Sequence, residues 1–185
     1  MRLFFALEPS GQDKLAIESW RYKALSSFEK PVPSKNFHIT LAFLGQTTSS
    51  QLDELIQKVD SLCVPPKFSV KLNHLGYWSK PKVLWLGCDQ TSDSLRALEK
   101  ELNKVSISSG IIMQKREFIP HLTLIRKCQE NPSAPIIEPS FFMEFCEFHL
   151  FESVSSSKGV IYQRLASWQL SPTQIPKSPE NTCFW

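Results

Sequence analysis

The sequence predicts an α+β protein of 185 residues, built as one domain with two pseudo-symmetric lobes. Two observations support this fold class. Short β-type segments alternate with amphipathic helical segments in the order β-α-β-α-β-β-α-β-β-β, which favours antiparallel sheets covered by helices. A four-residue pattern also occurs twice, as HITL at 38–41 and HLTL at 121–124, and each copy follows a predicted helix. We therefore expect two lobes of antiparallel sheet plus helices, with a cleft between them.

The first half of the chain is divided by proline, glycine and serine into four elements. The apolar run RLFFAL is closed by Pro9, and Ser49 or Ser50 is suited to cap the second helix. The predicted elements are a buried strand over 2–7, a helix from Gln12 to about Phe28, a strand over 36–45, and a helix over 51–62.

The second half begins after Pro65 and Pro66. Alternating apolar residues indicate strands, and Leu95, Leu98 and Leu102 lie at helical spacing after Ser92. The predicted elements are strands over 67–78 and 83–88, a helix from Ser92 to near Gly110, a strand over 117–126, a Pro-rich loop over 130–140, and strands over 141–153 and 159–170. We expect a single domain over 1–170 and a Pro-rich tail over 171–185.

The composition is that of an ordinary globular protein, with 42% hydrophobic and 21% charged residues. A formal net charge of +3 permits an anionic ligand but is low for a dedicated duplex binder. The five cysteines include no C-x-x-C pair, so neither a disulfide framework nor a zinc knuckle is indicated. The N-terminal run is too short for a signal peptide, and no apolar run approaches a membrane span. These features predict a cytoplasmic protein that does not enter a membrane. We also expect a monomer, although the sequence does not determine the oligomeric state.

The repeated His-x-Thr pattern has a direct chemical interpretation. Residues i and i+2 of a strand point to the same face, so His38 projects with Thr40, and His121 projects with Thr123. Two imidazoles can divide the roles of general base and general acid, and threonine hydroxyls can donate hydrogen bonds to oxygens that gain charge. A metal site would require at least three His, Cys or carboxylate ligands. The set suits in-line displacement at phosphorus, and we expect neither a metal nor a cofactor.

At these residues the chain resembles the 2H phosphoesterase superfamily, which is named for two His-x-Thr-x motifs. Within it, the chain is similar to the bacterial RNA 2′,3′-cyclic phosphodiesterases, historically called 2′-5′ RNA ligases. The resemblance covers about residues 2–170, and the family-like segments occur in the family's order: RLFFAL, PSKNFHITLAFLG, LGYWSKPKVLWLG, FIPHLTLIR and YQRLASWQL. It implies a bilobal 2H phosphoesterase-like fold with the active site in the cleft between the lobes.

The resemblance also implies roles for particular residues. His38 would be the proton donor and His121 the proton acceptor, each accompanied by its threonine, although the sequence alone does not order the two histidines. Arg126 occupies the place of an arginine that faces phosphate in the family. An ideal strand would put Arg126 on the face opposite His121, so either the strand ends or bulges there, or Arg126 is only nearby.

Further residues near the motifs are candidates for RNA contacts. Aromatic rings that can stack on a terminal base are Phe43, Tyr77 and Trp78. Basic side chains that can follow an RNA backbone are Lys80, Lys82, Lys115, Arg116 and Lys127.

The resemblance implies hydrolysis of the 2′,3′-cyclic phosphate at an RNA 3′ end to a 2′-phosphomonoester, without a metal. It also implies weak, ATP-independent 2′-5′ RNA joining, and substrates that include tRNA fragments. One alternative is a 2H phosphodiesterase that acts on cyclic-phosphate nucleotides such as ADP-ribose 1″,2″-cyclic phosphate. Another is a non-catalytic RNA-end binding module. Both motifs are intact, which argues against the binding module.

Overall fold

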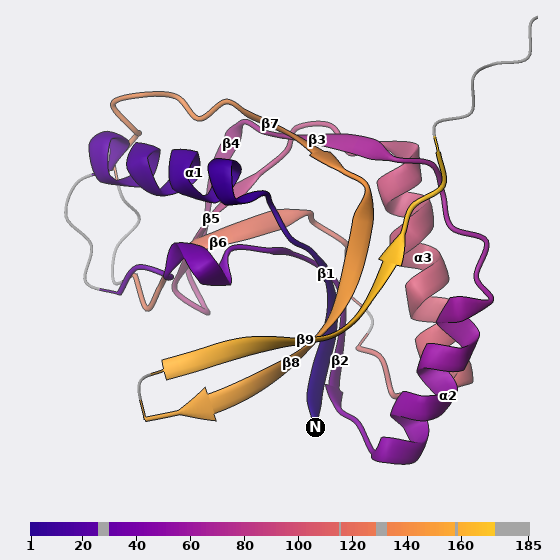
Figure 1. Ribbon diagram of the computed structural model, residues 1–185. Coiled ribbons are helices and arrows are strands. Elements are labelled where there is room, and N and C mark those ends of the chain that lie inside the picture. The colour runs from indigo at the N-terminus through magenta and orange to yellow at the C-terminus, as the bar shows by residue number, and fades with distance from the viewer. Residues whose placement is uncertain (26–29, 115, 129–132, 158, 173–185) are drawn as a thin grey trace, which may run out of the picture.

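The computed structural model describes residues 1–25, 30–114, 116–128, 133–157 and 159–172. Within these ranges the protein consists of a seven-stranded sheet, a two-stranded sheet, three α-helices and one 3-10 turn, η1 (Ser34–Asn36). Figure 1 shows how the helices and the sheets are arranged. The predicted α+β class is confirmed.

The large sheet contains the strands that carry both His-x-Thr patterns, and every neighbouring pair in it is antiparallel. Its order is β4 (His74–Trp78), β5 (Val83–Gly87), β6 (His121–Arg126), β2 (Ile39–Gln46), β1 (Arg2–Leu7), β8 (Glu147–Ser156) and β9 (Gly159–Gln169). The small sheet pairs β3 (Phe68–Leu72) with β7 (Phe141–Phe145).

The large sheet has a narrow junction in its middle. β2 and β6 are in register at a single residue pair, Ile39 and Leu122. On one side of this junction lie β4, β5 and β6, and on the other side lie β2, β1, β8 and β9. The two predicted halves are therefore parts of one continuous sheet, and the His-x-Thr strands meet where the halves join.

The helices cross between the two halves. α1 (Gly11–Ala24) precedes β2 in the chain, but its Arg21 side chain bonds to the carbonyl of Leu124 in β6. α3 (Asp93–Ser108) precedes β6, but it packs against β2 and against α2 (Ser49–Asp60). Figure 1 shows α1 on the side of β4 to β6, and α2 and α3 together on the side of β1 and β2. Each half of the sheet is thus covered by the helix that leads into the other half.

Local sequence explains where the helices begin. Ser10 and Ser92 accept hydrogen bonds from backbone N–H groups three residues later, as N-caps do. Thr48, rather than the predicted Ser49 or Ser50, caps α2, because its hydroxyl and the Gln51 side chain form a reciprocal capping box. α1 ends at Ala24, earlier than predicted, since Leu25 has extended backbone angles; residues 26–29 lie outside the described ranges.

Two predicted strands are each two strands, and two others begin later than predicted. The run 67–78 divides at Asn73, where the chain leaves the small sheet and enters the large one, and the run 141–153 divides in the same way at Cys146. The apolar alternation shifts by one residue at each break, from Val70 and Leu72 to Leu75 and Tyr77, and from Met143 and Phe145 to Phe148 and Leu150. The shift marks the two breaks, but it does not reveal that the chain changes sheet there. The strands predicted over 36–45 and 117–126 begin at Ile39 and His121.

The two faces of the large sheet have different environments. Leu3, Phe5 and Leu7 of β1 are fully buried in the main core. Phe4 and Ala6 point the other way, into a small cluster with Phe151 and Tyr162. This second face carries the His-x-Thr side chains.

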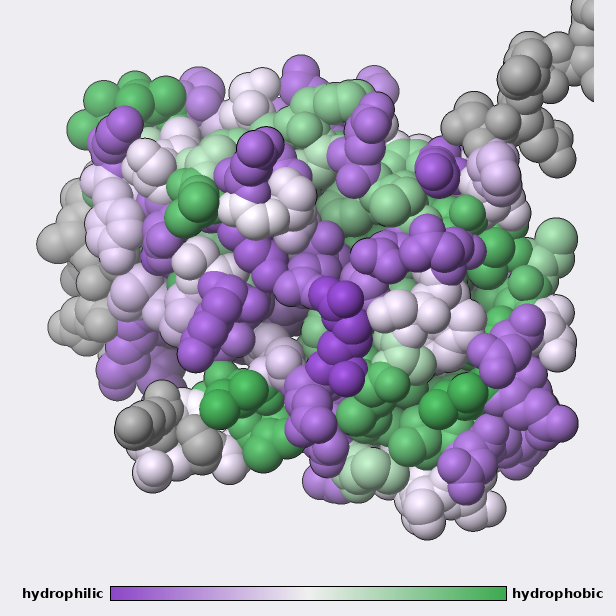
Figure 2. Space-filling model, in the orientation of Figure 1, coloured by the Kyte–Doolittle hydropathy of each residue, from purple (hydrophilic) through white to green (hydrophobic). Residues whose placement is uncertain are grey.

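The C-terminal part of the described chain forms an edge hairpin and a short contact with residue 66. The β8–β9 hairpin projects from the sheet (Figure 1) and carries exposed apolar side chains at Val154, Val160 and Ile161. Figure 2 shows that hydrophobic residues, in green, also reach the surface elsewhere on this face. Ser171 pairs with Pro66, and the predicted tail from residue 173 onward lies outside the described residues. In the part of the chain that the structure describes, no helix is long and apolar enough to cross a membrane.

Candidate active site

The junction between β2 and β6 brings the four motif side chains together. Ile39 and Leu122 are registered partners and point into the core, so the residues on either side of them point to the opposite face. The antiparallel direction places His38 next to Thr123 and Thr40 next to His121, with the two histidines on a diagonal. These side chains line a cleft of about 240 Å³ together with Trp78, Pro81, Val83, Arg116 and Arg126.

A β-bulge follows each motif. Opposite β1, the pairing passes from Thr40 to Ala42 and skips Leu41; opposite β5, it passes from Thr123 to Ile125 and skips Leu124. Two consecutive residues are consequently buried on each strand, which resets the alternation of side chains.

The bulge explains how Arg126 reaches the cleft. Val83 pairs with Arg126 and Trp85 pairs with Thr123, and Val83 and Trp85 lie on one face of β5. Arg126 therefore shares the face of Thr123, although its spacing from His121 is odd. The sequence left open a strand end, a bulge or an Arg126 that is only nearby, and the structure has the bulge.

The three aromatic candidates are placed differently. Trp78 lines the cleft and lies edge-on to the His121 ring, with ring centroids 4.6 Å apart. Tyr77 points to the other face of β4, where its hydroxyl donates to the carbonyl of Cys128 at 2.9 Å. Phe43 is half-exposed beneath the Arg2 guanidinium and does not line this cleft.

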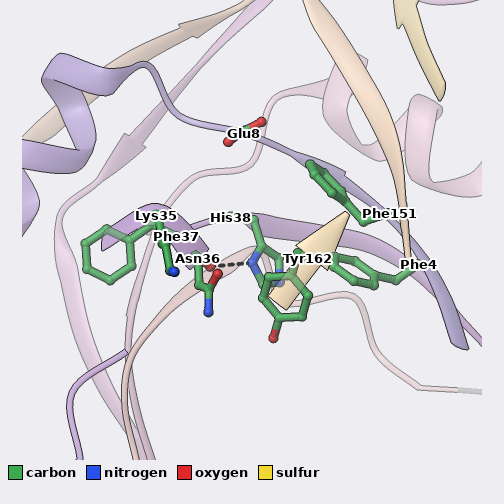
Figure 3. A pocket seen from close by; sticks show the side chains of 8 residues that line it. All are labelled: Phe4, Glu8, Lys35, Asn36, Phe37, His38, Phe151 and Tyr162. Carbon is green, nitrogen blue, oxygen red and sulfur yellow. Dashed lines mark hydrogen bonds between the residues drawn. The ribbon is translucent and has the colours of Figure 1, made fainter. Parts of the chain in front are cut away.

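Both histidines are oriented in the same way. The Nδ1 atom of His38 lies 2.7 Å from the carbonyl oxygen of Asn36, drawn as a dashed line in Figure 3. The Nδ1 atom of His121 lies 2.8 Å from the carbonyl oxygen of Ile119. A carbonyl oxygen only accepts hydrogen bonds, so each Nδ1 carries the hydrogen and donates. Each Nε2 atom is then left for proton transfer.

Aromatic rings hold both imidazoles. Tyr162 lies edge-on to His38 with ring centroids 4.9 Å apart, and Phe4 lies 5.0 Å away; Figure 3 shows all three rings gathered together. His121 packs against Trp78 in the same edge-on manner, with Trp85 behind. A Cβ atom at Gly76 would lie 2.2 Å from the Trp85 ring, so this ring requires a glycine in the adjacent strand.

A second, smaller cavity lies beside His38. Its volume is about 30 Å³, enough for a water molecule. Figure 3 shows the side chains that line it: Phe4, Glu8, Lys35, Asn36, Phe37, His38, Phe151 and Tyr162.

The electrostatics of the cleft keep both imidazoles neutral. Burial lowers the pKa of His38 to about 4, and the nearby Arg126 and His121 add to this effect, while the Asn36 carbonyl opposes it. Burial also lowers the pKa of His121, again with a contribution from Arg126. A bound anion would counteract the positive charge and favour protonation of one imidazole.

The donor set of the cleft suits an anion better than a metal. Its polar groups are two imidazoles, two hydroxyls, two guanidinium groups and the indole N–H of Trp78. Among the described residues, no group of three or more His, Cys, Asp or Glu side chains is arranged to hold a metal ion. The arrangement can bind a phosphodiester, donate hydrogen bonds to its oxygens and move protons at two points.

Sequence reasoning did not single out several residues of the site. Phe4, Tyr162 and Trp85 hold the imidazoles, and each reads as an ordinary strand residue. Arg116 was predicted only as one of five basic side chains that can follow an RNA backbone. In the structure it lines the cleft from the loop after α3. These aromatic rings lie on β1, β9 and β5, and only the order of the strands in the folded sheet brings them to the motif residues.

Comparisons with known proteins agree with this geometry. A family model described as LigT like phosphoesterase matches residues 8–85. The Escherichia coli protein named RNA 2′,3′-cyclic phosphodiesterase is 31% identical over 173 residues, covering 92% of this chain and 97% of the relative. A protein of the same name from Aeropyrum pernix is 33% identical over 148 residues, covering 74% of this chain and 83% of the relative. The crystal structure of E. coli LigT complexed with 3′-AMP is 32% identical, covers 94% of this chain and 98% of its own, and superposes with a TM-score of 0.84.

The lowered pKa values generate a testable prediction. In the free protein, NMR titration should show His38 staying neutral down to about pH 4, and His121 titrating below the usual 6.5, because burial and Arg126 disfavour the charged forms. Addition of inorganic phosphate should move at least one of the two titrations to higher pH. A free protein in which both imidazoles titrate at or above 6.5 would contradict the described environment.

Proposed function

The chain belongs to the LigT-like phosphoesterase family of the 2H superfamily, and we propose on this basis that it hydrolyses the 2′,3′-cyclic phosphate at RNA 3′ ends. The observation that carries the proposal is the pair of imidazoles on one cleft, each fixed through Nδ1 with Nε2 left for proton transfer. Two such groups are what acid–base displacement at phosphorus requires.

The proposed mechanism places the cyclic phosphate between the two histidines. Arg126 and Arg116 attract the phosphate anion, and the hydroxyls of Thr40 and Thr123 donate hydrogen bonds to its non-bridging oxygens. Because the histidines lie on a diagonal, one imidazole can face the attacking water while the other faces the leaving oxygen. The product is a 2′-phosphomonoester with a free 3′-hydroxyl.

The two histidines have different protonation requirements. Following the family resemblance, we assign His121 as the acceptor of the water proton and His38 as the donor to the 3′ oxygen. Both are neutral in the free protein at neutral pH, so the donor must take up a proton when the anionic substrate binds.

Substitution of the histidines tests the mechanism. His38→Ala and His121→Ala should each lower turnover of an oligonucleotide ending in a 2′,3′-cyclic phosphate by about 100-fold or more, and the double variant should be little worse, because both serve one step. His74→Ala is the matched control, since His74 is exposed and lies outside the cleft. Near-full activity in either folded cleft variant would contradict the assignment, and faster turnover of ADP-ribose 1″,2″-cyclic phosphate than of RNA would favour the alternative substrate class.

Metal independence is a separate part of the proposal. The two imidazoles and two hydroxyls of the cleft offer too few ligands for a catalytic metal site. Turnover should be unchanged after exhaustive treatment with a chelator. Loss of activity that a single divalent ion restores would contradict metal independence.

The same displacement explains weak RNA joining. If a 5′-hydroxyl of a second RNA replaces water as the nucleophile, the product is a 2′-5′ linkage, and the cyclic ester already contains the activated phosphorus. Joining should be slow relative to hydrolysis, because the hydroxyl competes only through the effective concentration that binding supplies. Gel analysis should show joining without ATP, and its loss in His38→Ala and His121→Ala. Joining that needs ATP or survives both substitutions would require another site.

A further inference from the structure

We propose that Arg21, which lies outside the cleft, is a positioning residue that holds the β6 bulge and thereby turns Arg126 toward the phosphate. The inference rests on the proposed function in that Arg126 is taken to bind the substrate phosphate. It assigns a role in substrate binding to a buried arginine of α1.

Arg21 is an unusual core residue, because it is charged and only 1% exposed. Its Nη1 atom donates to the carbonyl oxygen of Val32 at 2.6 Å and to that of Leu124 at 3.1 Å. Its guanidinium also lies over the Phe37 ring and 3.5 Å from a carboxylate oxygen of Glu18. Burying a guanidinium costs free energy unless it is well bonded, so these contacts must serve the fold or the site.

The Leu124 carbonyl belongs to the bulge itself. Leu124 is the extra residue that the β5–β6 pairing skips, and its carbonyl points away from β5. There it accepts from the Val32 backbone N–H at 2.9 Å as well as from Arg21. Arg21 thus bonds to both partners of this contact, the bulged residue and the segment beside it.

The segment at 30–32 runs along the bulged part of β6. Pro31 forms an isolated bridge with Ile125, and the Arg126 N–H donates to the Lys30 carbonyl at 3.2 Å. The bulge is therefore enclosed by β5 on one side and by this segment on the other. Arg21 is the side chain from α1 that ties the segment to the bulged residue.

The direction of Arg126 depends on the bulge. Without the extra residue, regular alternation would put Arg126 on the core face, because its spacing from His121 is odd. An arginine at position 21 keeps a permanent positive charge and can bond two carbonyls at once. A side chain at position 21 that has no hydrogen-bond donor cannot bond the Val32 and Leu124 carbonyls. The bulge is then less firmly held, and Arg126 is less firmly directed toward the cleft.

The experiment measures steady-state kinetics on the cyclic-phosphate oligonucleotide, and the affinity for inorganic phosphate by calorimetry. Arg21→Met, which keeps the length of the side chain but cannot donate, should raise KM and the phosphate Kd about tenfold and change kcat less than about threefold. In an Arg126→Ala background, Arg21→Met should have almost no further effect on either quantity. Arg21→Lys keeps the charge and a hydrogen-bond donor, so its KM and phosphate Kd should lie between those of the wild type and Arg21→Met. If Arg21→Met does not fold, the KM and phosphate Kd of Arg21→Lys test the positioning role.

Two further readouts separate positioning from general stability. Leu98→Ala removes a fully buried side chain of α3, the helix that packs on α2 and β2, so it should lower the melting temperature without changing KM. NMR titration of His121 should move toward its ordinary pKa in Arg21→Met, since Arg126 no longer lies close to it.

The outcomes are distinguishable. A wild-type KM and phosphate Kd in folded Arg21→Met and Arg21→Lys, or an equal effect of Arg21→Met with and without Arg126, would overturn the positioning role. If the wild-type protein does not turn over the cyclic phosphate, the proposed function fails, while the phosphate affinities still decide whether Arg21 acts through Arg126.

Discussion

The site depends on one point of contact, the pairing of Ile39 with Leu122. This single registered pair joins the two halves of the large sheet. Because both residues are fully buried, the histidine before each and the threonine after each must face the cleft. A shift of one residue between β2 and β6 would turn one motif into the core. The crossed helices stabilise this register, since α1 is tied to β6 and α3 packs on β2.

On the two sides of this junction, the His38 and His121 rings are held by equivalent contacts that come from different residues. Each imidazole is tethered to the carbonyl two residues before it, each is packed edge-on by one aromatic ring, and each motif is followed by a bulge. The bulges lead to different side chains, Phe43 in one half and Arg126 in the other. The cleft is therefore symmetric in its imidazoles and asymmetric in its charge, which suits the proposed substrate with one phosphate and two chemically different oxygens.

The sequence was sufficient for the fold class and the four motif residues, because strand periodicity and residue type determine both locally. The sequence was insufficient for features that depend on tertiary contacts, such as strand breaks, the bulge and the side chains that surround the motif residues. The apolar alternation shifts by one residue at Asn73 and at Cys146, but only strand pairing shows that the chain changes sheet there. The bulge at Leu124 was only one of the possibilities for Arg126, since a run of apolar residues does not reveal which one is extra. Tyr162, Phe4 and Arg21 reach the site from elements distant in sequence, so no local pattern could identify them.

The central claim is that two imidazoles lie on opposite sides of one phosphorus atom. A crystal structure with a uridine–vanadate complex, which imitates the five-coordinate state of in-line displacement, tests this claim most directly. We expect the Nε2 atom of His38 within about 3 Å of one apical oxygen and that of His121 within about 3 Å of the other, since that is the reach of a general acid or base. We also expect the Arg126 guanidinium to contact an equatorial oxygen. Vanadate bound with both imidazoles on the same side, or outside the reach of either Nε2, would contradict the account.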